Sequence, residues 1–227
     1  VKDIHSNKPR VWALTHAMIH TEPGDFIKDG TIVIRNGKIE KVGRYIQIPG
    51  DAFEIDLEGA NVYAGFIDGW LEVKQDEKVN SPDDHWNKRM RTEYRAKDDL
   101  NIKEKDLKAL YSIGFTAAHI VPENGIFKGK SDLVILNDNF ISVAKDVAQV
   151  MTFKTGGWGE PYPHSLLGMI AFMRQSLLDA EWYGRSTAII EKYPEENEPI
   201  PLNPSLAALE DFRANRHPML FKTREEH

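Results

Sequence analysis

Apolar and polar residues alternate in short stretches over the first 60 residues, which predicts β-strands joined by tight turns. The expected strands cover residues 11–19, 31–34, 38–42 and 53–55. Asn36 and Gly37 lie between two of these strands and favour a two-residue hairpin, because both residues tolerate a positive φ. We therefore expect a small antiparallel sheet module in residues 1–60.

A different pattern begins near residue 61. Residues 61–68 are almost continuously apolar, which is typical of a strand buried on both faces of a parallel sheet. The polar stretch 70–101 shows no periodicity and predicts a long loop. A helix is then expected over residues 102–110, with Gly114 as its C-terminal cap. Strands are expected at 115–121 and 133–136, so the order predicts a strand-helix-strand unit with parallel strands.

The last third of the chain is predicted to be mostly helical. Apolar residues recur at helical spacing over residues 164–192. After a linker rich in Pro and Glu, Asn203 and Pro204 suit the cap and the first position of a helix over 205–215. A further strand is expected at 218–222, and the chain ends five residues later. Because nothing follows to cover that strand, we infer a fragment of a longer polypeptide.

Composition excludes several classes of protein. The 29 Lys and Arg residues are scattered among 35 Asp and Glu residues, and the net charge is −6, so we expect no nucleic-acid partner. No stretch approaches the roughly 18 apolar residues of a membrane span, which predicts a soluble chain. The absence of cysteine removes disulfides and thiolate metal sites. Localisation stays open: the first residue is Val1, which is compatible with export and removal of a signal segment.

An ordered set of short motifs runs through the first 68 residues. They are ALTHA at 13–17, Gly24, DGTIVIRNGKI at 29–39, Val42-Gly43, Pro49, IDLEG at 55–59 and GFID at 65–68. Together these motifs resemble the start of the amidohydrolase superfamily, in the branch around imidazolonepropionase and dihydroorotase-like enzymes. The resemblance implies an α/β fold, with a β-sandwich module in residues 1–60 and an incomplete (β/α)8 TIM-like barrel in residues 61–227. It also implies hydrolysis of non-peptide carbon-nitrogen bonds by a metal-activated water.

The resemblance also implies where metal ligands would lie. In active relatives a His-x-His pair follows the GFID motif, and two imidazoles spaced this way in a strand face one side and share a metal. Trp70 and Glu72 replace that pair here. A later barrel strand in relatives ends near another ligand histidine, and Lys222 takes that position. Active relatives hold zinc or a similar divalent metal, whereas we expect no metal and assign no catalytic residue in this chain.

Two functions stay open at this point. Residues 107–125 and 165–183 look similar to the first halves of tandem amidohydrolase-like proteins. The expected partners are therefore the remainder of the same polypeptide or a second amidohydrolase-like domain, and a homo-oligomer is a further option. The chain is either a ligand-depleted region of an amidohydrolase-family protein or a non-catalytic scaffold that supports an active partner.

Each candidate side chain has a functional and a structural interpretation. Asp68 either lines a site at the end of the first barrel strand or caps the following loop. Glu72 and His119 either rebuild a metal site or make separate contacts, since a histidine in an apolar strand is often a hydrogen-bonded core residue. His85 either lines the mouth of a site or lies in a solvated loop. Lys222 is either buried or a strand-end lysine that reaches solvent.

Overall fold

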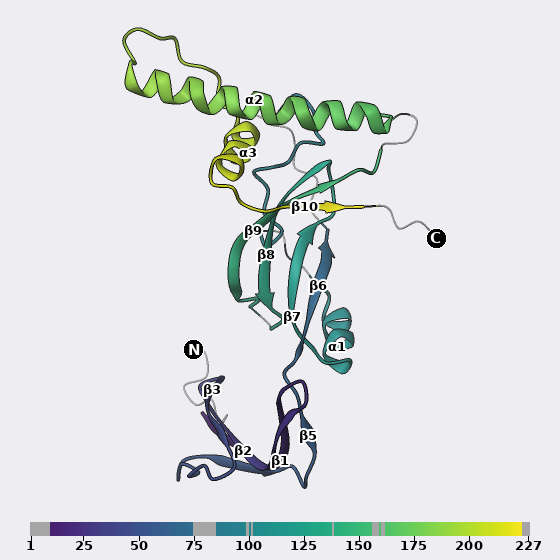
Figure 1. Ribbon diagram of the computed structural model, residues 1–227, viewed down its shortest axis with the longest axis vertical. Helices are drawn as coiled ribbons and strands as arrows, with labels where there is room; N and C mark the ends of the chain where they lie inside the picture. Colours follow the sequence, from purple (N-terminus) through teal and green to yellow (C-terminus); the bar gives the residue numbers. More distant parts are fainter. Residues whose placement is uncertain are drawn as a thin grey trace, which may run out of the picture. The chain divides into compact units, whose positions relative to one another are not determined.

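The chain folds into two compact units, residues 1–65 and 66–227. The computed structural model describes residues 10–74, 85–98, 100, 102–137, 139–155, 159 and 162–223 (Figure 1). The sequence placed the boundary after residue 60, and the two units divide five residues later. In these ranges no helix combines the length and the apolar character that crossing a membrane requires.

The described part of unit 1, residues 10–65, contains one five-stranded sheet. Its strands are β1 (Val11–Glu22), β2 (Asp25–Arg35), β3 (Lys38–Gly43), β4 (Phe53–Asp56) and β5 (Asn61–Val62). The hairpin between β2 and β3 is confirmed, and Asn36 and Gly37 have φ values of 52° and 76°. β4 and β5 pair with β1 in parallel, so the sheet is mixed rather than antiparallel throughout.

Unit 2, residues 66–227, contains a second five-stranded sheet and three helices in its described part. The elements are β6 (Phe66–Val73), α1 (Glu104–Ser112), β7 (Phe115–Pro122), β8 (Phe127–Ile135), β9 (Ser142–Thr152), α2 (Leu166–Lys192), α3 (Pro204–Ala214) and β10 (Met219–Lys222). The strand order is β10-β9-β8-β7-β6. β6 and β7 are parallel and joined through α1, as the sequence predicted. The strand expected over residues 61–68 and buried on both faces is instead β6 at 66–73, and its first residues, Phe66 and Ile67, are exposed.

The prediction of an incomplete (β/α)8 barrel is wrong. β8 runs antiparallel to both β7 and β9, whereas such a barrel has parallel strands with a helix after each one. The physical reason is loop length: four residues separate β7 from β8 and six separate β8 from β9. A parallel connection needs a dozen or more residues, so the chain must turn back on itself.

The glycine after α1 and the start of α3 lie where local signals predicted, whereas α1 begins at Glu104, two residues later than expected, and its N-cap residue Lys103 makes no side-chain hydrogen bond. Gly114 follows α1 with a φ of 93°, and the side chain of Asn203 accepts a hydrogen bond from the backbone N–H of Leu206 at 2.9 Å. α2 is one continuous helix of 27 residues. One core cluster joins α2 and α3 to β8 and β9, and a second joins α1 to β6, β7 and β8.

The long loop expected over residues 70–101 is irregular over the described residues 85–98, as predicted, but it begins later than expected and is largely buried. Residues 70–73 belong to β6, and the segment 85–98 follows β8 through isolated bridges from Met90 to Phe127 and from Arg95 to Lys130. Met90 and Tyr94 are buried. Gly129 makes this approach possible: its φ is 119°, and a Cβ there would lie 2.6 Å from the carbonyl oxygen of Tyr94.

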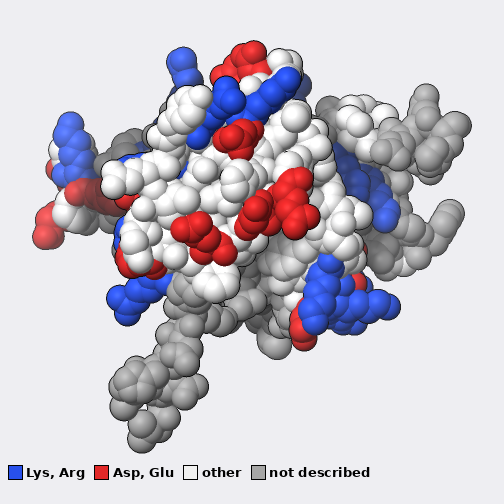
Figure 2. Space-filling view, turned by 90° about the horizontal axis from the view of Figure 1, so that it is seen from below, with Lys and Arg blue, Asp and Glu red and all other residues white. Residues whose placement is uncertain are grey.

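Charged side chains of both signs share the surface. On the face shown in Figure 2, Lys and Arg side chains are interspersed with Asp and Glu and separated by uncharged residues. Among the described residues of that face, no continuous patch of one sign is seen.

Candidate functional site

The positions singled out near the end of β6 lie on one face of the unit 2 sheet. Side chains alternate along a strand, and Leu71 and Val73 pack into the cluster beside α1. Trp70 and Glu72 therefore face the other side. The backbone N–H of Trp70 donates to Asp68 Oδ1 at 2.9 Å, at a point where β6 carries an irregularity against β7. The carboxylate of Asp68 thus bonds the backbone two residues later in its own strand.

Glu72 is held by two lysines from two other strands. Its Oε1 accepts hydrogen bonds from Lys222 Nζ at 2.8 Å and from Lys128 Nζ at 3.0 Å. Lys128 is only 4% exposed, whereas the side chains of Glu72 and Lys222 are 28% and 45% exposed. The buried ammonium of Lys128 and the more exposed ammonium of Lys222 therefore bond the same carboxylate oxygen of Glu72.

These contacts join the two edges of the sheet. Glu72 belongs to the edge strand β6, and Lys222 belongs to β10, the edge strand at the other end of the order. An ion pair between them requires the sheet to curl, and Figure 1 shows β8 and β9 bent in this way. Lys128 lies at a bulge of β8, between the paired residues Phe127 and Gly129. The bulge explains how a lysine in the middle of a buried strand turns its ammonium toward Glu72.

The two lysines determine the protonation of Glu72. Burial alone would raise the pKa of this carboxyl group, but the hydrogen bonds from Lys222 and Lys128 outweigh burial, and the pKa lies below its usual value of 4.5. The carboxylate is therefore ionised at neutral pH, with two ammonium groups on its Oε1.

His119 has its own partners on the neighbouring strand β7. Its Nδ1 lies 3.2 Å from the carbonyl oxygen of Gly69, which only accepts, so this nitrogen carries a proton. Its Nε2 lies 2.8 Å from the hydroxyl of Ser131, which also bonds the backbone of Ala148. In the described part of the chain no contact joins His119 to Glu72. The side chain behaves as a hydrogen-bonded histidine within the sheet.

His85 belongs to a different part of unit 2. It is buried, its Nδ1 accepts a hydrogen bond from the backbone N–H of Asn87 at 3.1 Å, and its ring contacts Phe172 of α2. Burial holds the pKa of His85 below 6.5. Its neighbour Trp86 is 71% exposed. His85 therefore packs in the core beside α2. The two lysines that contact Glu72 come from other elements, β8 and β10.

The chemistry of the Glu72 cluster is that of an ion-pair network. Within the described ranges no group of three or more His, Asp or Glu side chains is placed to hold a metal ion. Two ammonium groups about 3 Å from Glu72 Oε1 would repel a divalent cation there. Sequence reasoning missed Lys128. Its signal was a lone lysine in the apolar stretch Ile126-Phe127-Lys128, since a buried lysine needs a paired acid.

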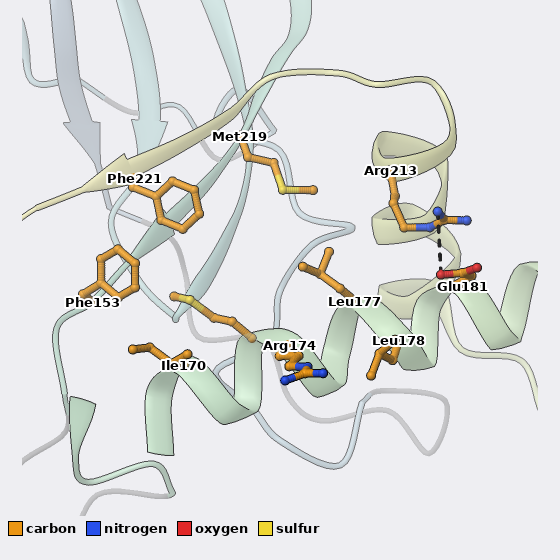
Figure 3. A pocket seen from close by; sticks show the side chains of 10 residues that line it. Phe153, Ile170, Arg174, Leu177, Leu178, Glu181, Arg213, Met219 and Phe221 are labelled. Atoms are coloured by element: carbon orange, nitrogen blue, oxygen red, sulfur yellow. Dashed lines mark ion pairs between the residues drawn. The ribbon is translucent and has the colours of Figure 1, made fainter. Parts of the chain in front are cut away.

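An open apolar groove is the second feature of unit 2. It has a volume of about 580 Å³ and lies between α2, β10 and the last turns of α3 (Figure 3). Ile170, Leu177 and Leu178 line it from α2, and Met219 and Phe221 line it from β10. At its end Arg213 lies 3.9 Å from Glu181.

No family model matches the chain, and no curated protein matches it significantly.

Proposed function

We propose that this chain is a non-catalytic supporting part of an amidohydrolase-type protein, in which an ion-pair network takes the place of a metal centre. The observation that carries the proposal is the direct contact of Glu72 with Lys222. The resemblance marks both residues as replacements of ligand histidines, and they are 150 residues apart in the chain. The corresponding positions serve one centre in the relatives, and the contact between Glu72 and Lys222 supports the proposal on this ground.

The replacement changes what the position can do. A metal centre needs neutral imidazoles and free carboxylates, because cations compete for the same lone pairs. Here the carboxylate of Glu72 is neutralised by Lys128 and Lys222, and both ring nitrogens of His119 face protein groups. The network instead ties β6, β8 and β10 together. Its role in the proposal is to hold the curled sheet in shape for the remainder of the polypeptide or for a second, active domain.

Equilibrium dialysis against zinc and manganese, with bound metal measured by mass spectrometry, tests the proposal. We expect no stoichiometric binding by the chain, and no difference between the wild type, Glu72→Gln and Glu123→Gln. Glu123 is an exposed carboxylate outside the network and serves as the matched control. One equivalent of metal that Glu72→Gln abolishes and Glu123→Gln preserves would refute the proposal.

A further inference from the structure

Asp132 is a buried acidic residue that does not belong to the Glu72 cluster. It lies in β8 and is only 1% exposed. It pairs with Ile120 of β7, which packs in the core cluster beside α1, so Asp132 faces this side of the sheet and Glu72 the other. Burying a carboxylate is costly unless cations or hydrogen-bond donors compensate its charge. The neighbours of Asp132 therefore decide whether it is charged.

A bulge in β9 brings a second carboxyl group beside Asp132. Between two regular pairs of β8 and β9, residues 145–147 of β9 oppose Asp132 alone. Asp146, in the middle of this bulge, has a φ of 51°. Its backbone N–H donates a hydrogen bond to Asp132 Oδ1 at 2.8 Å. The bulge thus makes neighbours of two acidic residues from adjacent strands.

Arg95 compensates only one of these two carboxyl groups. Its Nη2 donates a hydrogen bond to Asp146 Oδ2 at 2.5 Å. The other oxygen, Asp146 Oδ1, is buried and accepts no hydrogen bond from any residue that the structure describes. Lys97, on the same segment as Arg95, attracts Asp132 more weakly than Arg95 does. Two ionised carboxylates would therefore share one close cation, and a buried acceptor would lack a donor.

We propose that Asp132 and Asp146 share one proton, and that this proton sets how firmly the segment 85–98 is held to the sheet. The proton belongs to Asp132, because the guanidinium of Arg95 favours the charged form of Asp146. The protonated Asp132 donates a hydrogen bond to Asp146 Oδ1 and still accepts one from the backbone N–H of Asp146. One cation, one anion and one neutral acid then remain, which leaves no surplus charge in the cluster.

The proton makes this contact sensitive to pH. Burial and the nearby charge of Asp146 raise the pKa of Asp132 above its usual 3.8, against the hydrogen bond from Asp146 and the attraction of Arg95. A group with a raised pKa stabilises the folded chain below its unfolded pKa, and this stability is lost as the pH rises through the folded value. Loss of the proton leaves two like charges together beneath the segment. Its backbone bond from Ala96 N–H to the carbonyl oxygen of Lys130, 3.0 Å long, should then open more often.

Carbon-13 NMR of the side-chain carboxyl groups tests the shared proton in the whole chain. We expect Asp132 to titrate above pH 3.8 in the wild type and at a lower pH in Asp146→Asn, which removes the neighbouring negative charge. Glu123→Gln, at an exposed position, should leave the titration of Asp132 unchanged. An Asp132 carboxyl that titrates at or below 3.8 in the wild type, or that does not respond to Asp146→Asn, would overturn the proposal.

Asp132→Asn tests the consequence for the segment. The amide imitates the protonated acid, since its N–H donates to Asp146 Oδ1 and its oxygen accepts the backbone N–H. At pH 7 this variant should have a Tm at least about 2 °C above that of the wild type and slower hydrogen exchange at the Ala96 amide. Both differences should shrink as the pH falls toward 4, and Glu123→Gln should show neither. A lower Tm than the wild type at pH 7, or a gain as large at pH 4 as at pH 7, would contradict the proposal.

Discussion

Removing the charge of Glu72 should destabilise unit 2 by more than a surface ion pair would. Glu72→Gln removes a charged partner of the buried Lys128, and removing one partner of a fully buried pair costs about 3–5 kcal/mol. Because Glu72 is 28% exposed, we expect about 2–3 kcal/mol. Lys222→Met removes only the more exposed ion pair, between Lys222 and Glu72, and should lower the free energy of unfolding by about 0.5 kcal/mol.

Urea unfolding followed by circular dichroism at the helix band measures this loss, since the described helices all belong to unit 2. The decisive variant is Glu72→Gln/Lys128→Met, which removes the buried ammonium as well as its partner. It should be more stable than Glu72→Gln alone. Additive destabilisation, or a Glu72→Gln cost below about 0.5 kcal/mol, would refute the assignment of a buried ion pair.

The same pair predicts a dependence on pH. Because the pKa of Glu72 is lowered in the folded chain, its contribution is complete above about pH 4.5 and is lost as the pH falls through the folded value. The difference in unfolding free energy between wild type and Glu72→Gln should therefore be constant from pH 6 to 8. It should shrink in acid, and a difference that persists unchanged at pH 3 would contradict this account.

Three further predictions concern other parts of unit 2. Gly129→Ala should cost about 3 kcal/mol in urea unfolding, because its Cβ would meet the carbonyl oxygen of Tyr94 at a positive φ; a cost below 1 kcal/mol would exclude this close approach. Gln149 is fully buried, and neither of its amide atoms has a hydrogen-bond partner among the described residues. Gln149→Met should therefore raise the free energy of unfolding by about 1–2 kcal/mol. A lower free energy of unfolding would reveal a bound partner for the amide. Because the pKa of His85 is lowered in the folded chain, the folded state loses stability as the pH falls below 6.5. The drop in Tm from pH 7 to 5.5 should therefore be smaller in His85→Asn than in the wild type. The exposed control His164→Asn should behave like the wild type.

Features set by neighbouring residues could be predicted from the sequence. The hairpin at Asn36-Gly37, the glycine end of α1 and the Asn203 cap of α3 each depend on the conformational preferences of one to three residues. Tertiary contacts do not override such preferences where the turn is tight.

The topology of unit 2 could not be predicted in this way. Its sheet is mixed because the loop after Pro122 is too short for a helix, and the expected strand over residues 133–136 is the end of a longer strand, β8. The sequence did not predict β9, because Lys145 and Asp146 interrupt its apolar pattern. Asp146 pairs with Arg95, which lies 51 residues away.

The contacts of the Glu72 cluster could not be predicted from the sequence. The resemblance pointed to Glu72 and Lys222, and nothing in the local sequence of either residue indicates that they meet. Lys128, the third member, becomes recognisable only when the bulge at Gly129 turns it toward Glu72.

A crystal structure of unit 2 with diffraction data collected at the zinc and manganese absorption edges would show whether a metal or an ion-pair network occupies this position, because anomalous scattering locates a metal independently of the protein atoms. We expect Lys128 Nζ and Lys222 Nζ at about 3 Å from Glu72 Oε1, with no anomalous peak beside them. A peak within coordination distance of Glu72 or His119, with the lysines turned away, would contradict this expectation.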